Sequence, residues 1–468
     1  MPKTPAQPKP LVAGASREIR SAVCTRCGCG CDDVDLTVEG NRVVAARNAC
    51  ALGQPWFLAP LVEDDPPARV DGREVPVEEA AAAAAELLAG ARRPLIWGLV
   101  HCSSEAQKLA IEIGDRLGGV VDPAAGPNHA AAVTAFQEWG EVNTTLGEVT
   151  LQKSLIVLWN VEPERTHPRL LERWGAVSSD AERVIRPGGD RAGGDRLSPE
   201  GRLDLLWTLR ELARSRAAAS DAAAKGQPAA PGDGSAGSTP PGGQASGEGA
   251  PAEAARLLDR LATEPHAVLV FDAAATPPGE QHALRALAAT LNAVTRVRLF
   301  ALGGPGNRAG ADAVLTWQTG FPAGVDFASG APRANGGEFG AARLLARRDV
   351  DAALVVCSDP ADIPSEPALA RLRDLPLVVL DSAANSLLDK ARVALRSAPY
   401  GLASGGTFFR MDGVALGLRP AVTSRYPTEA DWLSGILSRL PARSAPRGDA
   451  ASGKAAARPK RQKRKRTP

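Results

Sequence analysis

Six short apolar runs alternate with helix-like segments, and this alternation constrains the fold more than any other feature of the chain. Near-continuous apolar strands are typical of parallel sheets that are covered by helices on both faces. The segments SSEAQKLAIEIGDRLG and PGEQHALRALAATLNAV, which follow two of these runs, have the spacing of amphipathic helices. The sequence therefore predicts an α/β fold with several doubly wound parallel-sheet units. The runs are 94–101, 154–161, 267–274, 296–302, 351–359 and 375–382.

Three segments lack the composition to form a core, and they divide the chain. Residues 1–17 are polar and rich in proline, 216–252 are almost entirely Ala, Gly, Pro and Ser, and 440–468 end in KAAARPKRQKRKRTP. Such segments bury too little apolar surface to offset the entropy of ordering, so we expect them to be disordered. The folded domains expected between them are a cysteine-rich iron–sulfur domain and two α/β domains, at 18–65, 66–215 and 253–439.

The charges are unevenly distributed. The chain has 55 Lys or Arg and 53 Asp or Glu, but eight of the basic residues fall in the last fifteen positions, which contain no acidic residue. The rest of the chain is therefore mildly acidic, which argues against a nucleic-acid-binding core. The basic run is typical of a solvated tail, and electrostatic attachment to RNA, an acidic partner or a surface is the alternative.

The sequence gives no sign of a membrane or an export pathway. No run of about 18 apolar residues is present, and the N-terminal MPKTPAQPKPLVAGASREIR lacks the apolar segment of a signal peptide. Five of the seven cysteines fall between Cys24 and Cys50, which is too clustered for a disulfide framework and indicates metal binding. We expect a cytoplasmic protein without membrane contact.

The cysteine cluster has the spacing C-x2-C-x3-C-x18-C. A [4Fe–4S] cubane needs four thiolates at the corners of a tetrahedron, which a tight loop and the hairpin expected at 33–49 could supply together. A structural zinc site, which prefers two C-x2-C pairs, and a vestigial site without metal are the alternatives. Cys29 is left over. The expected ligands are Cys24, Cys27, Cys31 and Cys50.

The segments CTRCGCGCDDVDLTVEG and ACALGQPWF resemble the cluster domain of molybdopterin oxidoreductases, and Asp32-Asp33 narrows the resemblance to the B subunit of formylmethanofuran dehydrogenase. The chain looks most like the B subunit of the bacterial formyltransferase/hydrolase complex. The resemblance covers most of residues 20–420. Its further blocks are GVVDPAAGPNHAAAVTAFQEWGEVNTTLGEV (119–149), Glu162-Pro163 with His167-Pro168-Arg169, Gly304-Pro305-Gly306-Asn307 with Gly310, TGFPAGVDFASGAPRANGGE (319–338), DAALVVCSDP (351–360) and GGTFFRMDGVALGLRP (405–420).

The block at 119–149 departs from the family at the metal ligand. In the family pattern a Cys or selenocysteine lies six residues after an Asp and nine before a Gln. Asp122 and Gln137 keep this separation, and the ligand position falls on Asn128. Molybdenum or tungsten needs an anionic protein ligand beside its pterin dithiolenes, and a neutral amide is a poor substitute. The resemblance thus implies that the Mo/W bis-pterin is absent. A dehydrogenase with a different ligand and a pterin kept for structure are the alternatives.

A second departure points the same way. The family has an Arg beside the metal where this chain has Ser329, although Arg333 and Glu338 persist. No catalytic residue is assigned, and His129 and Arg333 remain the candidates. We expect the two remaining thiols, Cys102 and Cys357, to be buried core residues because both lie in strand contexts.

Three further candidates have a functional and a plain interpretation. His129 could polarise a formyl or carboxylate oxygen, or it could be a leftover polar residue near a filled cavity. His167 and Arg169 could bind a pterin phosphate, since Arg offers a planar fork to such groups, or they could begin a helix after a strand. The run 303–307 could approach a phosphate through its backbone amides, and a plain turn is the favoured interpretation.

The resemblance implies a role in tetrahydromethanopterin-linked one-carbon metabolism. In the related bacterial complexes a formyl group passes between a methanofuran-like carrier and tetrahydromethanopterin, with hydrolysis on the A subunit and transfer on the D subunit. We therefore expect a non-redox scaffold subunit that assembles with A, C and D subunits. The alternatives are an active dehydrogenase with [4Fe–4S] and Mo/W bis-pterin, and a zinc-stabilised module whose basic tail contacts nucleic acid.

Overall fold

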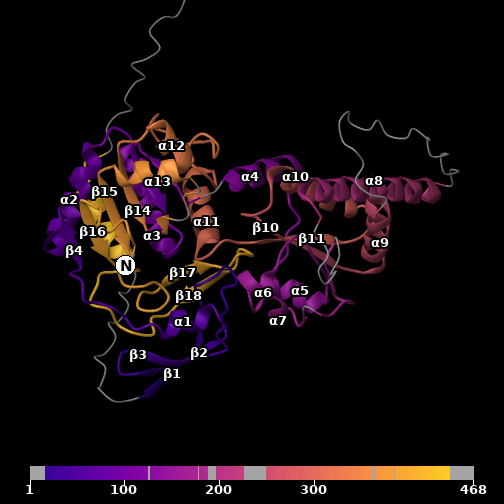
Figure 1. Cartoon of the computed structure of the whole chain (residues 1–468), viewed down its shortest axis with the longest axis horizontal. Coiled ribbons are helices and arrows are strands. Elements are labelled where there is room, and N and C mark those ends of the chain that lie inside the picture. Colours follow the sequence, from indigo (N-terminus) through magenta and orange to yellow (C-terminus); the bar gives the residue numbers. More distant parts are fainter. Residues whose placement is uncertain are drawn as a thin grey trace, which may run out of the picture.

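The structure is a computed structural model that describes residues 16–124, 127–177, 179–187, 197–225, 249–360, 363, 365–383 and 385–442. Its strands form four sheets, and the two largest are covered by helices (Figure 1). The predicted α/β class with parallel sheets is confirmed. Within these ranges, no helix combines the length and the apolar character that crossing a bilayer requires.

A small antiparallel sheet opens the described chain. It consists of β1 (Ser16–Ala22), β2 (Val34–Glu39) and β3 (Arg42–Arg47), and the hairpin predicted at 33–49 is its β2–β3 pair. Ser16 and Arg17 pair with β2, so these two residues, which were predicted to be disordered, belong to a strand. Residues 1–15 lie outside the described residues. The short helix α1 (Gly53–Leu58) packs on β3.

The largest sheet has nine strands in the order β13-β12-β7-β6-β14-β15-β16-β4-β5. The five strands from β7 to β16 are parallel, and the flanking strands β12 and β4 run antiparallel to their neighbours. The bounds are β4 (Ala68–Val70), β5 (Arg73–Glu74), β6 (Pro94–Gly98), β7 (Val120–Asp122), β12 (Val325–Asp326), β13 (Arg333–Ala334), β14 (Ala352–Val356), β15 (Leu377–Asp381) and β16 (Val393–Arg396).

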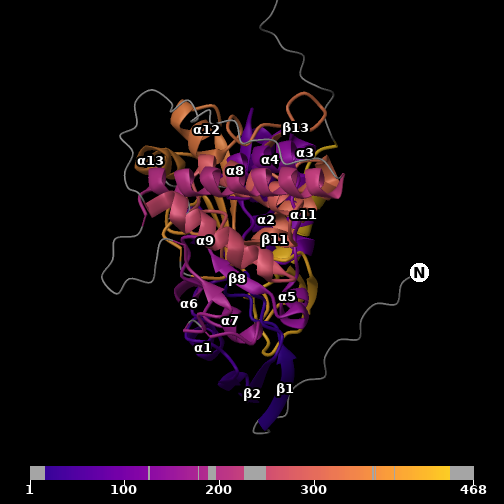
Figure 2. The same ribbon diagram turned by 90° about the vertical axis from the view of Figure 1, so that its right-hand side faces the viewer.

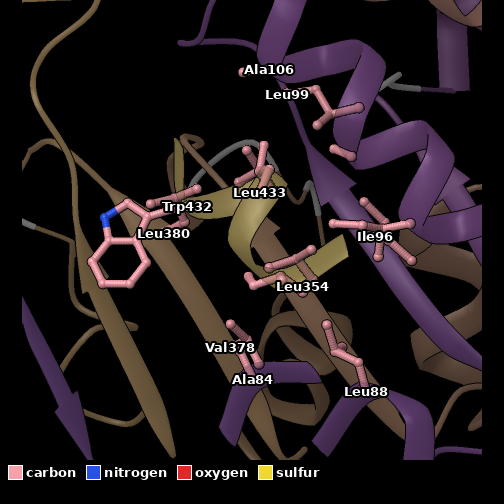
Figure 3. Packing of buried hydrophobic residues seen from close by; sticks show 14 of the residues in the cluster. Ala84, Leu88, Ile96, Leu99, Ala106, Leu354, Val378, Leu380, Trp432 and Leu433 are labelled. Atoms are coloured by element: carbon pink, nitrogen blue, oxygen red, sulfur yellow. The ribbon is translucent and has the colours of Figure 1, made fainter. Parts of the chain in front are cut away.

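Alternate residues of its central strands face opposite helix layers. Ile96, Leu354 and Val378 point toward one layer, where they pack with Ala84, Trp432 and other residues of a common core (Figure 3). Their neighbours along each strand belong to the core on the opposite face. The first layer contains α2 (Val77–Gly90), α3 (Ser104–Leu117), α11 (Arg308–Thr319) and α14 (Glu429–Arg439), and the second contains α12 (Ala341–Arg347) and α13 (Glu366–Arg373).

A second, fully parallel sheet has four strands in the order β11-β10-β8-β9. One face packs against three helices, and the other face shares a core with the small sheet β1–β3 and the cysteine loop that connects β1 to β2 (Figure 2). The strands are β8 (Leu155–Leu158), β9 (Val184–Ile185), β10 (Ala267–Asp272) and β11 (Val297–Leu302), and the helices are α8 (Pro199–Ala224), α9 (Gly249–Thr263) and α10 (Pro278–Leu291).

The remaining elements lie around the junction of the two large sheets. Figure 1 shows α4 between the nine-stranded sheet and the helices α8 to α10. The β17–β18 hairpin packs against α3 and α11. The bounds are α4 (Pro127–Trp139), α5 (Leu146–Gln152), α6 (Pro163–Thr166), α7 (Leu170–Arg173), β17 (Gly406–Phe409) and β18 (Ala415–Leu418).

The predicted division into α/β domains at 66–215 and 253–439 is wrong. The four-stranded unit occupies 155–302 and is inserted between β7 and β12 of the nine-stranded sheet. The predicted linker at 216–252 is also too long, because α8 continues to Ala224 and α9 begins at Gly249. Its first residues are mostly Ala, the best helix former, so a composition that cannot make a core still makes a helix. Residues 226–248 and 443–468 lie outside the described residues.

Helix α14 begins with a capping box that supports a modest stability prediction. The Thr428 hydroxyl accepts from the Asp431 amide, and the Asp431 carboxylate accepts from the Thr428 amide. We expect Thr428→Ala to lower the free energy of unfolding by about 1 kcal/mol, because an orphan amide loses its partner. Denaturant unfolding followed by circular dichroism would measure it. Ser438→Ala, at the exposed end of the same helix, is the control and should change little.

Candidate functional site

The first three candidate cysteines lie on one closed loop. The Cys24 amide donates to the Cys31 carbonyl at 2.8 Å, and the Gly30 amide donates to the Cys27 carbonyl at 3.3 Å. Gly30 has a φ of +49°, and a Cβ there would lie 2.7 Å from the Phe408 ring. This position therefore needs glycine, and the loop folds back tightly enough to gather its thiols.

The fourth cysteine joins this loop through Gly53. A Cβ on Gly53 would lie 3.1 Å from the Cys24 Sγ and 3.9 Å from the Cys50 Sγ. The two sulfurs thus flank the same backbone position, at the start of α1. Because residue 53 is a glycine without a side chain, both sulfurs can approach its backbone. The structure brings Cys50 to the loop, as the spacing predicted.

The thiols differ in acidity. Burial raises the pKa of Cys24 to about 12 and that of Cys31 to about 11, with Arg173 partly offsetting the effect at Cys31. The pKa of Cys27 is lowered to about 7 because the Cys29 thiol donates a hydrogen bond to its sulfur. Thiolates are the ligands of metals, so Cys27 is better prepared for metal binding than Cys24 and Cys31, which would have to lose protons on binding.

The four candidate cysteines lie near one another, but their side chains do not surround a single metal position. In the described part of the chain, no group of three or more His, Cys, Asp or Glu side chains is arranged to hold a metal ion. A cubane differs from a single ion because each thiolate binds a different iron, which keeps the four sulfurs apart. The four thiols are therefore the described residues that could hold such a cluster, one thiolate to each iron.

Arg169 ties the two ends of the cysteine set together. Its guanidinium donates two hydrogen bonds of 2.7 Å to the Asp33 carboxylate, two residues after Cys31. It donates a third, of 2.8 Å, to the carbonyl of Asn48, two residues before Cys50. The proposed contact of Arg169 with a pterin phosphate is therefore corrected, because carboxylates of this chain already occupy the fork.

Arg173 supports the same junction from the next turn. Its guanidinium lies 2.7 Å from Asp32 and 3.2 Å from Asp33. Both arginines come from α7 and its N-cap, so the four-stranded unit holds the cysteine loop through charge-assisted hydrogen bonds. His167, predicted with Arg169 as a cofactor contact, is buried, and its Nδ1 lies 2.9 Å from the Thr166 hydroxyl. Burial lowers the pKa of His167.

The degenerate ligand position lies on a large cavity between the two α/β units. Asn128, near the start of α4, donates from Nδ2 to the Ala274 carbonyl at 2.7 Å. The amide is thus engaged with the loop after β10. The cavity has a volume of about 850 Å³ and is lined from both units, by residues of α4, of the loops after β10 and β11, and of α11.

The donor set of this cavity does not fit a molybdenum or tungsten centre. The described residues that line it include one sulfur atom, the Met411 thioether, and no thiol. Cys102 and Cys357 are buried in the core of the nine-stranded sheet, as predicted, and neither lines the cavity. An anionic sulfur ligand is therefore missing from the part of the cavity that the structure describes.

Met411 separates the cavity from the cysteine loop. Its amide donates to the Gly28 carbonyl at 2.9 Å. A Cβ on Gly28 would lie 3.1 Å from the Met411 Cβ, and one on Gly303 would lie 3.0 Å from it. The two glycines thus let one side chain fill the gap between the loop and the cavity wall.

Three polar side chains, those of His129, Arg308 and Asp312, line the cavity. The sequence left the role of His129 open and did not indicate the other two. His129 on α4 and Asp312 on α11 lie 3.4 Å apart, between Nε2 and Oδ1. Arg308, at the start of α11, donates to the Ala124 carbonyl at 2.7 Å. The sequence singled out His129 from the resemblance, but no motif marked Arg308 or Asp312, because their place depends on how α11 packs.

Arg333, a weak catalytic candidate, is not at the cavity. Its side chain is 59% exposed, pairs with Asp326 at 3.0 Å and stacks on Phe339. The expectation that Arg333 lies at the site is corrected, because β13 places this residue at the edge of the nine-stranded sheet. Ser329 is also exposed, and its hydroxyl donates to the Ala331 carbonyl.

The glycine-rich run at 303–307 is a packed turn with a structural asparagine. Asn307 is fully buried, and its amide donates to the Cys102 carbonyl, the Ser104 hydroxyl and the Thr407 carbonyl. Its Oδ1 accepts from the Phe409 amide at 2.8 Å. The turn therefore joins α3, α11 and β17, which supports the favoured interpretation of a plain turn.

A smaller cavity of about 190 Å³ lies beyond the carboxyl ends of β6, β14 and β15. Its lining includes His101, Ser358 and Asp381 from the segments that end these strands, together with Arg26 from the cysteine loop. Burial lowers the pKa of His101 to about 4, so this imidazole is neutral at physiological pH. Strand ends of this kind commonly bind ligands in open parallel sheets.

Comparison with known proteins finds relatives that match most of the chain. It is 29% identical to the B subunit of tungsten-containing formylmethanofuran dehydrogenase 2 from Methanocaldococcus jannaschii over 440 residues, covering 86% of this chain and 94% of that protein. The chain is a homologue of the formylmethanofuran dehydrogenase B subunit. The corresponding protein from Methanococcus maripaludis is 27% identical, with the same coverage. No family model matches the chain.

Bacterial relatives are also similar. The B subunit of the formyltransferase/hydrolase complex Fhc from Methylorubrum extorquens is 27% identical, covering 79% of this chain and 96% of that protein. The crystal structure of the FhcABCD complex from this organism, determined with methylofuran, contains a similar chain with a TM-score of 0.61 and 26% identity. The match covers 80% of this chain and 98% of that one. The resemblance seen in the sequence is confirmed.

Proposed function

We propose that the chain is a non-redox scaffold subunit of a formyltransferase/hydrolase-type complex in tetrahydromethanopterin-linked one-carbon metabolism. The observation that carries this proposal is Asn128. It stands at the metal-ligand position, its amide is hydrogen-bonded to Ala274, and the described lining of the adjoining cavity has no thiol. A subunit that keeps the dehydrogenase fold without this ligand would serve assembly in place of electron transfer.

The proposed partners follow from the bacterial relatives. The similar chain in the M. extorquens structure belongs to the FhcABCD assembly with methylofuran. We therefore propose A, C and D subunits as partners, a methanofuran-like carrier at the level of the complex, and a cytoplasmic location. Exposed apolar side chains such as Leu151, Val177 and Trp317 are consistent with surfaces that other subunits would cover.

A [4Fe–4S] cluster on Cys24, Cys27, Cys31 and Cys50 is part of the proposal. When bound, such a cluster can exchange single electrons, and it also cross-links the loop of Cys24, Cys27 and Cys31 to the segment of Cys50. In a scaffold subunit we propose that the cross-link is the useful property. The hydrogen bonds of Arg169 would hold the Cys31 and Cys50 segments at the separation that the cluster requires.

An active dehydrogenase is the second candidate, and one observation favours it. The two archaeal relatives are tungsten-containing enzymes, and they match more of this chain than the bacterial relative does. In that case a ligand other than the Asn128 amide would hold the metal.

Metal content separates the two candidates. We expect the complex purified through a tag on this chain to contain additional subunits and far less than one molybdenum or tungsten atom per chain, measured by mass spectrometry of the elements. It should also fail to reduce a viologen dye with formate. Molybdenum or tungsten near one per chain, with dye reduction, would establish the dehydrogenase instead.

A further inference from the structure

The cavity beside Asn128 has the size of a small-molecule site. Its volume of about 850 Å³ falls in the range of roughly 300–1,000 Å³ that is common for ligand pockets. One wall is apolar and comes from Ala132, Val133 and Phe136 on α4. Ala301 and Leu302 at the end of β11 contribute the facing wall. A ligand here would have an apolar body.

One cation in this cavity, Arg308, makes no close ion pair within the described residues, although Asp312 is near enough to interact with it electrostatically. The Arg308 guanidinium donates to the Ala124 carbonyl, and its Nε is covered and has no partner in the described part of the chain. A Cβ on Gly304 would lie 2.7 Å from that Nε. Glycine at this position therefore leaves room for the guanidinium to lie flat along the cavity wall.

The other charged or titratable side chains of the cavity form two close pairs, Arg285 with Glu141 and His129 with Asp312. Arg285 pairs with Glu141 at 2.6 Å, and both side chains are almost completely buried. Asp312 lies 3.4 Å from His129, and burial raises the pKa of its carboxyl group, while the charges of His129 and Arg308 act in the opposite direction. Arg308 is therefore the cation of this cavity that no carboxylate of the described residues holds in a close ion pair.

His129 and Asp312 have unused hydrogen-bonding capacity next to Arg308. The His129 Nε2 and the Asp312 Oδ1 are covered, and although they are 3.4 Å apart, neither makes a hydrogen bond within the described residues. Buried polar atoms without partners are rare in native proteins, and a bound ligand commonly satisfies them. These two atoms and the Arg308 Nε all belong to residues that line the same cavity.

We propose that this cavity binds an organic acid with an apolar body, whose anionic group contacts Arg308 between His129 and the Gly304 backbone. The aliphatic or aromatic part would lie along α4 and the end of β11. This site goes beyond the scaffold role, and its failure would leave that role intact, because the role depends on assembly and metal content.

Binding of simple acids to the purified complex tests the proposal. Butyrate, octanoate and 2-naphthoate would be titrated by calorimetry, with 2-naphthamide as the uncharged counterpart of the last. We expect saturable binding that strengthens with the size of the apolar part, and naphthoate should bind at least about tenfold more tightly than naphthamide, since a charge-assisted hydrogen bond is at stake.

Matched variants assign the binding to this cavity. Arg308→Gln keeps a donor for the Ala124 carbonyl but removes the charge, and we expect it to weaken naphthoate binding about tenfold or more. Val133→Trp should abolish binding by filling the cavity. Arg347→Gln, at an exposed arginine of α12, should bind naphthoate as the wild type does.

Three results would overturn the proposal. The first is that none of the acids binds saturably. The second is equal affinity for naphthoate and naphthamide, and the third is wild-type affinity for naphthoate in Arg308→Gln. Comparable unfolding temperatures of the complex for the wild type and Arg308→Gln would show that any loss of binding does not come from misfolding.

Discussion

Arg169→Gln is expected to lower the free energy of unfolding by about 2 kcal/mol at neutral pH. The substitution removes the paired hydrogen bonds to Asp33 and leaves the Asn48 carbonyl without this donor. Hydrogen bonds to charged groups contribute about 1.5–3 kcal/mol each when buried, and water reaches Asp33, whose side chain is 45% exposed, so the sum is reduced. Denaturant unfolding of the full chain, with limited proteolysis of the N-terminal sheet, measures the effect.

Two further variants make this result specific. Arg165→Gln removes an exposed arginine of α6 that pairs with Glu162, and it should change stability by less than about 0.5 kcal/mol. Arg169→Lys retains the charge but not the planar fork, so its stability should lie between the wild type and Arg169→Gln. Equal stability of Arg169→Gln and Arg165→Gln would contradict the role of Arg169 as a tie between the cysteine segments.

The same pair predicts a pH dependence. The Arg169 guanidinium lowers the pKa of Asp33 below its ordinary value of 3.8. A lowered folded-state pKa contributes stability that is complete above the unfolded-state pKa and is lost as the pH falls through the folded-state pKa. The difference between the wild type and Arg169→Gln should therefore be constant at neutral pH and shrink below about pH 4.

Cys50→Ala is expected to remove most of the iron and acid-labile sulfide from the purified complex, if the proposed cluster is assembled. Cys50 would be the ligand that joins the loop to the start of α1, and its loss opens one corner of the cubane. Iron, sulfide and the visible absorption of the complex, prepared without oxygen, measure the outcome. The matched control is Cys102→Ala, which removes a buried thiol in the core of the nine-stranded sheet and should retain the iron.

The possible outcomes distinguish the interpretations of this site. Full iron content in Cys50→Ala would show that the ligand set is wrong. Wild-type complex without iron or sulfide would indicate the vestigial site. Zinc near one atom per chain, without sulfide, would favour the structural zinc site.

Six strands of the two large sheets, β6, β8, β10, β11, β14 and β15, could be predicted from the sequence as apolar runs, but the other strands and the membership of each sheet could not. The runs at 94–101 and 351–359 are apolar enough to identify buried strands, and they form β6 and β14. Their pairing, Ile96 with Leu354, depends on contacts across the inserted unit, which no local pattern records. For the same reason the sequence placed the domain boundary between them incorrectly.

The candidate site shows the same limit. Cysteine spacing predicted that Cys50 would join the loop because a short hairpin brings it back. Family resemblance located Asn128. Arg169 was noticed for its charge but assigned to a phosphate, since its real partner, Asp33, lies far away in sequence. Arg308 and Asp312 sit on α11 without any motif, and only the packing of α11 beside α4 gives them a role.

The insertion of the four-stranded unit has a consequence for synthesis on the ribosome. The strand β6 emerges early, but its neighbour β14 emerges only after the whole segment 155–302 has been translated. During that interval the inserted unit can complete its own parallel sheet, while β6 presents an unpaired apolar edge. Nascent chains paused between these two points should therefore be the species that chaperones protect.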